Sequence, residues 1–297
     1  MPAVTSRRAL VALLSTVLLA GSAPMPTAAQ EPEPTPIAPP SLELALAGLA
    51  GTGAGPGVAG TGAGVAGTGA GVASTAAVGA DGLVYEPVKV RLPDCEVGDE
   101  LTRYRKVKQW NKTLLDTNLR LKRSYKPWDL VSVKRAKIAG SGKVRKLMIK
   151  DLRALAAAAR RAGKPLAVRS AYRSYDYQKA LFDSYVRSYG REQALKFSAR
   201  PGHSEHQLGT TVDFSVGPGV PLSSKFGDSP SGRWLARNGW KYGFIMSYPK
   251  GKRSASCYGY EPWHWRYFGR DLAREIYESG QVPRRYLYTN FEIAPPS

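Results

Sequence analysis

The chain has 297 residues, 43% of them hydrophobic, which is enough for one sizeable folded domain or two small ones. Its 43 Lys and Arg residues outnumber its 23 Asp and Glu residues and give a formal net charge of +20. This charge favours polyanionic partners, such as an anionic cell wall, an anionic membrane or nucleic acid. The sequence has no zinc-finger, RNP or leucine-zipper pattern, so we expect no nucleic-acid partner.

Residues 1–29 have the pattern of a signal peptide. Arg7 and Arg8 precede an apolar run from Ala9 to Ala20, and small residues follow as a cleavage site. The run is shorter than the about 20 residues that span a bilayer, although an uncleaved signal would still anchor the protein. Paired arginines also occur in twin-arginine signals. We therefore expect an exported protein, either secreted or held in the cell envelope.

Residues 30–82 have the composition of a linker rather than of a domain. A Pro-rich stretch is followed by repeats of the type A-G-T-G-A-G-V, which lack bulky side chains. Such a segment buries too little apolar area to offset its ordering entropy. We expect a flexible spacer here, and a folded domain over residues 83–297.

Helices and short strands are predicted to mix within residues 83–297. Helix formers fill 146–162 before Gly163, and Ser174 is placed to cap a helix that continues to residue 188. The other predicted segments are strands at 165–173, 210–216, 244–248 and 263–268, and helices at 231–240 and 271–279. Strict β-α-β alternation is missing, which indicates an α+β fold with a small antiparallel sheet and flanking helices.

Two cysteines, Cys95 and Cys257, lie far apart and have no C-x-x-C spacing. A cysteine zinc site is therefore not indicated. In an oxidising compartment the pair predicts one disulfide, and the alternative is two buried free thiols. Such a disulfide would tie the start of the domain to the segment that contains Glu261.

The three histidines of the chain lie in two short segments. His203 and His206 belong to P-G-H-S-E-H-Q-L-G-T-T-V-D-F, and His264 belongs to Y-E-P-W-H-W-R-Y-F. A catalytic zinc site needs three protein ligands, an open position and a carboxylate that moves a proton. His206, Asp213 and His264 with Glu261 supply this set, although the spacing permits the site without proving it.

Other interpretations of the same residues stay open on spacing alone. Asp213 in a strand could pair with one of the many arginines, and a histidine beside aromatic residues is often only packed. Ser204 could serve a Ser-His-Asp hydrolase, but no G-x-S-x-G elbow is present. No H-E-x-x-H is present either, which excludes the common zinc-protease helix.

Three ordered motifs resemble one family of enzymes. S-A-Y-R-S-Y-x-x-Q (170–178), S-E-H-Q-L-G-x-x-x-D-F and E-P-W-H-W-R-Y are similar to those of VanY-type zinc D-alanyl-D-alanine carboxypeptidases, within a wider hedgehog and lysostaphin-like group. The resemblance covers roughly 113–267 and implies that family's fold, with one Zn²⁺ ion.

The resemblance also implies residue roles. His206, Asp213 and His264 would be the zinc ligands, and Glu261 the general base and then the acid. Arg173 would bind the scissile carbonyl oxygen or the substrate carboxylate, while Ser204 and Gln178 would contact substrate. His203 matches no ligand position.

The implied reaction is removal of the terminal D-alanine from peptidoglycan stem peptides. An L,D-carboxypeptidase acting on tetrapeptide stems shares every motif, and a non-catalytic wall-binding module is the alternative from another class. The expected partners are a stem peptide and the anionic cell wall, and we expect a monomer.

Overall fold

The computed structural model describes residues 77–78, 84–85 and 91–293 of the chain. The expected signal peptide at 1–29 lies outside the described residues, as does the expected linker except for residues 77–78. Among the described residues, no helix has both the length and the apolar character needed to cross a membrane.

The centre of the domain is a five-stranded sheet with the strand order β10-β11-β9-β8-β6. Its strands are β6 (Ala139–Gly140), β8 (Ala167–Ser170), β9 (Thr211–Ser215), β10 (Phe244–Met246) and β11 (His264–Tyr267). All pairs are antiparallel except β6 with β8. The predicted α+β class and the four predicted strands of this sheet are confirmed, whereas β6 and its parallel pairing were not predicted.

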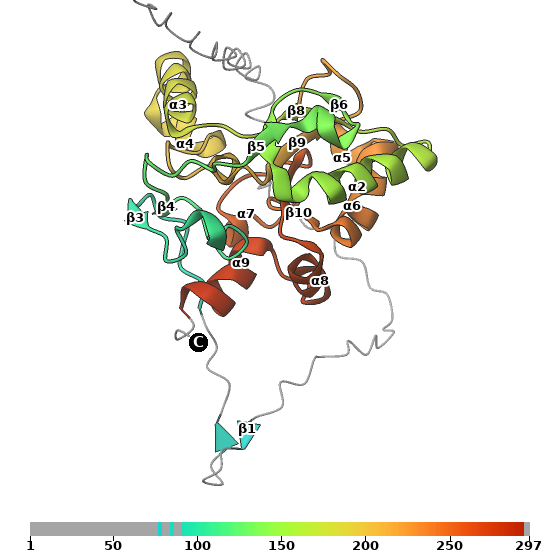
Figure 1. Ribbon diagram of the computed structural model, residues 1–297. Coiled ribbons are helices and arrows are strands. Elements are labelled where there is room, and N and C mark those ends of the chain that lie inside the picture. Colours follow the sequence, from blue (N-terminus) through green and yellow to red (C-terminus); the bar gives the residue numbers. More distant parts are fainter. Residues whose placement is uncertain (1–76, 79–83, 86–90, 294–297) are drawn as a thin grey trace, which may run out of the picture. The chain divides into compact units, whose positions relative to one another are not determined.

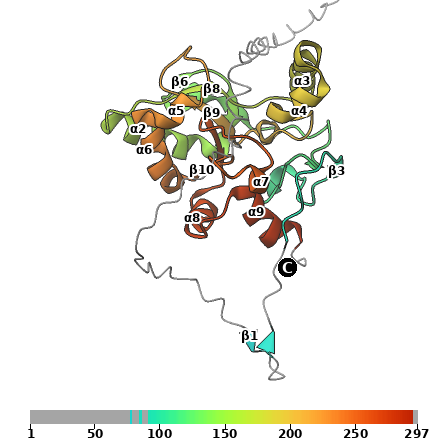
Figure 2. The same ribbon diagram turned by 180° about the vertical axis from the view of Figure 1, so that it is seen from behind.

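Eight α-helices are described around the sheet (Figure 1). They are α2 (Ile149–Arg161), α3 (Tyr175–Tyr189), α4 (Arg191–Phe197), α5 (Lys225–Asp228), α6 (Pro230–Asn238), α7 (Arg253–Ser256), α8 (Arg270–Glu278) and α9 (Pro283–Leu287). In both views α3 and α4 lie together, separated from α2 and α6 (Figure 2). Three short two-stranded pairs complete the described strands: β1 with β2 (Ala77–Val78, Val84–Tyr85), β3 with β4 (Glu100–Leu101, Leu119–Arg120) and β5 with β7 (Leu130–Ser132, Lys143–Arg145).

The helices begin and end where their sequences indicate. The Ser174 hydroxyl accepts a hydrogen bond from the backbone N–H of Tyr177, which satisfies one of the free donors at the start of α3. Gly163 follows α2 with a φ of 66°, a conformation that ends a helix at little cost for glycine. Both predicted signals are therefore confirmed.

The two faces of the sheet carry different side chains because strand residues alternate in direction. Val212 and Phe214 of β9 pack with Trp265 and Tyr267 of β11 in the main core, together with the apolar side of α2. Asp213, His264 and Arg266 alternate with these residues and are directed to the other face. Register places Asp213 directly opposite His264, so two polar side chains meet on that face.

A disulfide joins Cys95 to Cys257 across 162 positions of the sequence. Closing so long a loop restricts the unfolded chain and contributes about 5 kcal/mol to folding in the chain-entropy model. Cys257 directly follows α7, four residues before Glu261. The bond therefore attaches the start of the described domain to the segment that precedes β11.

Candidate metal centre and active site

His206 is carried by a short 3-10 helix, Glu205–Leu208, that leads into β9. The Ser204 hydroxyl caps this helix by accepting from the His206 N–H at 3.4 Å. Gly209 ends it with a φ of 72°, and a Cβ there would lie 3.0 Å from Leu130 and 3.1 Å from Arg145. Glycine is needed at this turn because a larger residue would be both strained and crowded. The turn brings the His206 ring back over β9, toward Asp213.

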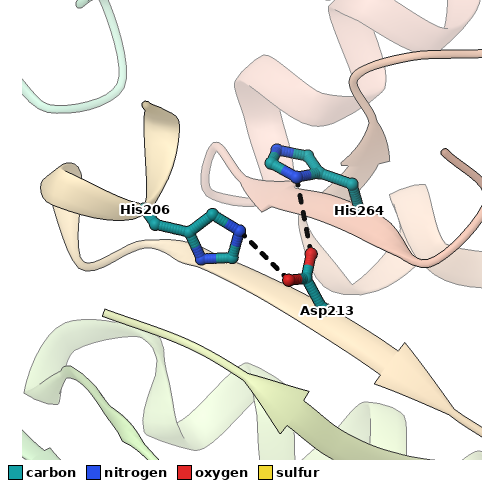
Figure 3. Close-up of side chains that lie close together, drawn as sticks. All are labelled: His206, Asp213 and His264. Atoms are coloured by element: carbon teal, nitrogen blue, oxygen red, sulfur yellow. Dashed lines mark ion pairs between the residues drawn. The ribbon is translucent and has the colours of Figure 1, made fainter. Parts of the chain in front are cut away.

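The side chains of His206, Asp213 and His264 converge (Figure 3), and one ligand atom from each lies within 4.8 Å of the others. His206 Nε2 is 3.3 Å from Asp213 Oδ2, and His264 Nδ1 is 3.4 Å from Asp213 Oδ1. All three residues are buried. The structure thus brings together the three residues that the sequence predicted as metal ligands.

The donor set of these three residues fits a zinc ion. His206 Nε2 and Asp213 Oδ1 are buried and have no hydrogen-bond partner among the described residues. Buried polar atoms are rarely left in this state unless another group satisfies them. Two imidazole nitrogens and one carboxylate oxygen are the usual ligands of a catalytic zinc, with a further position left for water or substrate.

Burial and neighbouring charges shift the pKa of each of the three residues. Burial lowers the pKa of His206 to about 4, so its imidazole is neutral and able to coordinate. Burial opposes the charged form of Asp213, but His206 and His264 outweigh it and lower the pKa of that carboxyl. Burial also opposes charge on His264, yet the carboxylates of Asp213 and Glu205 beside its ring raise its pKa to about 9.

Glu261 lies at the edge of this group, with Oε2 3.6 Å from His264 Nδ1. The His264 N–H donates to the Glu261 carbonyl at 3.0 Å, so a turn at Pro262 lets the two side chains converge. Burial raises the pKa of Glu261 to about 7, although its side chain keeps an exposed fraction of 21%. A carboxyl with partial access to solvent and a pKa near neutrality is suited to accept and return a proton.

Arg173 reaches the same group from the segment that follows β8. Its backbone N–H donates to the His206 carbonyl at 3.3 Å, and Nη2 lies 4.0 Å from Asp213 Oδ2. The side chain has an exposed fraction of 19%. The guanidinium is therefore held beside the ligands and partly open to a bound molecule.

Ser204 and Gln178 occupy structural positions. Ser204 has an exposed fraction of 5% and caps the 3-10 helix, and Gln178 has 2% and donates from Nε2 to the Ala199 carbonyl at 2.7 Å. Their expected contacts with substrate stay predictions. His203 lies apart from the three ligands, with Nδ1 2.9 Å from the Asp116 carbonyl and Nε2 3.5 Å from Asp99.

The sequence interpretation missed the buried residues behind His264. Glu205 contacts His264, Ser247 and Arg266, and all four side chains are buried. A usable signal was present, because His264 and Arg266 are two positions apart in a strand and must share a face. The aromatic residues next to His264 in the sequence belong to the hydrophobic core: Trp265 and Tyr267 are buried in it, and Trp263 packs against it.

Comparison with known proteins identifies relatives of this chain by sequence. The model of the VanY family, described as D-alanyl-D-alanine carboxypeptidase, matches residues 141–270. YodJ of Bacillus subtilis is 37% identical over 180 residues, covering 59% of this chain and 66% of YodJ. A D-alanyl-D-alanine carboxypeptidase of Enterococcus faecium is 33% identical over 120 residues, which are 40% of this chain and 35% of the relative. The chain thus spans less than two thirds of the length of these curated relatives.

Two solved structures match over almost their whole length. The LdcB LD-carboxypeptidase is 33% identical with a TM-score of 0.56, covering 64% of this chain and 97% of LdcB. A second match is a mutant of the D,D-pentapeptidase VanY from the VanB-type resistance cassette, in complex with Zn(II). It is 29% identical with a TM-score of 0.51, and the match covers 60% of this chain and 99% of that VanY chain. The buried group of His206, Asp213 and His264 accordingly fits one zinc ion. By its three motifs, its fold and these matches, the chain belongs to the VanY-type D-alanyl-D-alanine carboxypeptidase family.

Proposed function

We propose that the protein is a zinc-dependent D-alanyl-D-alanine carboxypeptidase that removes the terminal D-alanine from peptidoglycan stem peptides. The convergence of His206, Asp213 and His264 beside Glu261 and Arg173 is the observation that carries this proposal. The solved structure of VanYB in complex with D-Ala-D-Ala, 29% identical with a TM-score of 0.52, supports a ligand of this class.

Each residue of the group has a distinct task in the proposed reaction. His206, Asp213 and His264 would hold the zinc ion, which supplies a Lewis acid for the peptide carbonyl and acidifies water. Glu261 takes the proton from the attacking water and returns it to the amino group of the departing D-alanine. Arg173 supplies positive charge for the carbonyl oxygen, or for the terminal carboxylate of the peptide.

A direct test uses purified protein and synthetic stem peptides, with D-alanine release read by mass. We expect release from a pentapeptide that ends in D-Ala-D-Ala, loss of release with a chelator, and recovery when zinc is restored. The matched substrate control is the same pentapeptide ending in L-alanine, which should stay intact. If the protein binds cell wall but releases D-alanine from no stem peptide, the proposed enzymatic activity would be contradicted and a non-catalytic wall-binding module would be supported.

An L,D-carboxypeptidase is the second candidate, because LdcB is matched over 97% of its length. The two activities differ in the bond that is cut, so the same experiment separates them. Release from a tetrapeptide stem, with the pentapeptide left intact, would favour the L,D reaction.

Arg173→Ala is expected to lower kcat/KM by about 100-fold, which is typical for removal of one donor to a developing oxyanion. A fall in kcat would assign Arg173 to the carbonyl oxygen, and a rise in KM would assign it to the substrate carboxylate. Steady-state kinetics on the pentapeptide measure both. Arg187→Ala, on the exposed end of α3, is the matched control, and an unchanged kcat/KM for Arg173→Ala would remove Arg173 from the mechanism.

We also propose that the protein is exported and acts as a monomer at the anionic cell wall, without a nucleic-acid partner. Two surface hollows of about 380 Å³ each support the wall contact. One is lined by Ile149 and four basic residues, Arg135, Lys146, Lys150 and Arg153. The other includes Arg105, Lys106, Lys122 and Lys126. The described lining of both hollows contains no acidic residue, which suits a phosphate-rich polymer.

A further inference from the structure

Glu205 is a buried carboxylate that lies next to the metal group without offering an oxygen to it. Its exposed fraction is 4%, and both oxygens already have partners. Oε2 accepts from the Ser247 hydroxyl at 2.6 Å and from His264 Nε2 at 2.9 Å, while Oε1 accepts from Arg266 Nη1 at 2.9 Å. Glu205 therefore contacts His264 at Nε2, the ring nitrogen that does not face Asp213.

We propose that Glu205, held by Arg266, is a positioning residue that fixes His264 as a ligand through Nδ1. A carboxylate only accepts hydrogen bonds, so the proton of the neutral His264 ring must stay on Nε2. Nδ1, which faces Asp213 Oδ1 at 3.4 Å, is then left with a lone pair toward the metal position. This inference rests on the proposed zinc enzyme, but it concerns metal binding and not the bond that is cut.

His206 shows the opposite arrangement. Its Nδ1–H donates to the Ala171 carbonyl at 2.6 Å, which leaves Nε2 to face Asp213 Oδ2. The two imidazoles therefore use different nitrogens, and in each the other nitrogen is fixed by a hydrogen-bond acceptor. His206 is oriented by the backbone, whereas His264 depends on one side chain. Such partners of metal-bound histidines contribute about 10- to 100-fold to metal affinity.

Arg266 supplies the positive charge that pairs with Glu205 in the interior, because its Nη1 lies 2.9 Å from Glu205 Oε1 and both side chains are buried. Arg266 is fully buried, and its Nη2 donates to the carbonyls of Trp110 and Thr113 at 2.8 and 2.7 Å. The Trp110–Thr113 segment precedes the part of the chain that the family model matches. It therefore supports the metal site through Arg266 and Glu205.

The first experiment uses the wild-type protein. Long-range ¹H–¹⁵N NMR of the zinc-loaded enzyme reports which ring nitrogen is protonated and which is bound to metal, and the chain has only three histidines to assign. We expect His264 to be bound through Nδ1 with a proton on Nε2, and His206 to be bound through Nε2. A His264 ring bound through Nε2 would overturn the proposal.

The second experiment measures zinc affinity by competition with a chelator. Glu205→Gln is expected to weaken zinc binding by about 10- to 100-fold. Because this variant leaves Arg266 buried without its partner, the double variant Glu205→Gln, Arg266→Met is measured as well, and the same weakening is expected. Glu192→Gln, an exposed charge-matched control on α4, should bind zinc like the wild type.

The two readouts separate positioning from general stability. A merely structural role would lower the thermal midpoint of the zinc-free protein and leave the zinc affinity of folded molecules unchanged. A zinc affinity within twofold of wild type in either folded variant would overturn the proposal. Failure to release D-alanine from any stem, together with the expected zinc results, would instead count against the proposed function alone.

Discussion

Glu261→Gln is expected to lower kcat by about 100- to 10,000-fold while the protein keeps its zinc. Glutamine has nearly the same shape as glutamate but cannot accept a proton from water and return it to the leaving amine. The Glu261 carboxylate lies 3.6 Å from His264 Nδ1, close enough to serve a reaction at the metal group. It is not one of the three residues that form that group, so zinc binding should persist.

Steady-state kinetics and zinc content, measured on the same preparation, test this expectation. If the interaction is made only in the transition state, kcat and kcat/KM should fall by the same factor. Glu278→Gln at the end of α8, an exposed glutamate outside the site, is the matched control. D-alanine release at the wild-type rate by the Glu261→Gln protein would remove the general base from the proposed mechanism.

Asp213→Asn is expected to weaken zinc binding by more than about 100-fold and to abolish release of D-alanine at stoichiometric zinc. The substitution removes the only carboxylate among the three ligands and leaves the two imidazoles beside Arg173. Coulombic attraction for the cation is lost in a buried site, where charges are screened least. Loss of a direct ligand should exceed the about 10- to 100-fold effect of losing a supporting contact.

Chelator competition gives the zinc affinity, and the stem-peptide assay repeated with rising zinc shows whether activity returns. Asp271→Asn, an exposed aspartate in the first turn of α8, controls for the loss of one negative charge. Wild-type zinc affinity in Asp213→Asn would mean that the carboxylate is not a ligand. Weak zinc binding together with wild-type release of D-alanine would mean that the reaction does not depend on zinc.

Much of the fold could be predicted because its local signals are strong. One residue each indicates where two helices begin or end: Ser174 at the start of α3 and Gly163 after α2. The strands β9 and β11 are indicated by residues that alternate between the two faces of a sheet. The short strands β3 to β7 were not predicted, because a strand of two or three residues is too short to show an alternating pattern in the sequence. Their existence depends on partners that are distant in the sequence.

The candidate site also contains residues that the sequence predicted and residues that it did not. Residue types and motif order indicated His206, Asp213, His264 and Glu261, but spacing alone left other pairings open. The support from Glu205 and Arg266 was not predicted, because it depends on a contact across 61 positions that only the folded sheet creates. Ser204 caps the helix that carries His206, and its expected contact with substrate stays a prediction.

The direct pairing of Asp213 with His264 also limits how such a chain can change in length. A slip of one residue between β9 and β11 would turn Asp213 to the apolar face and place Val212 or Phe214 among the ligands. Insertions or deletions within these two strands are therefore expected to disrupt the group of His206, Asp213 and His264. The 28 positions from 216 to 243, between β9 and β10, are free of that constraint and contain none of the proposed reactive residues. A change of preferred peptide can thus arise there by loop replacement, while the metal ligands stay in register.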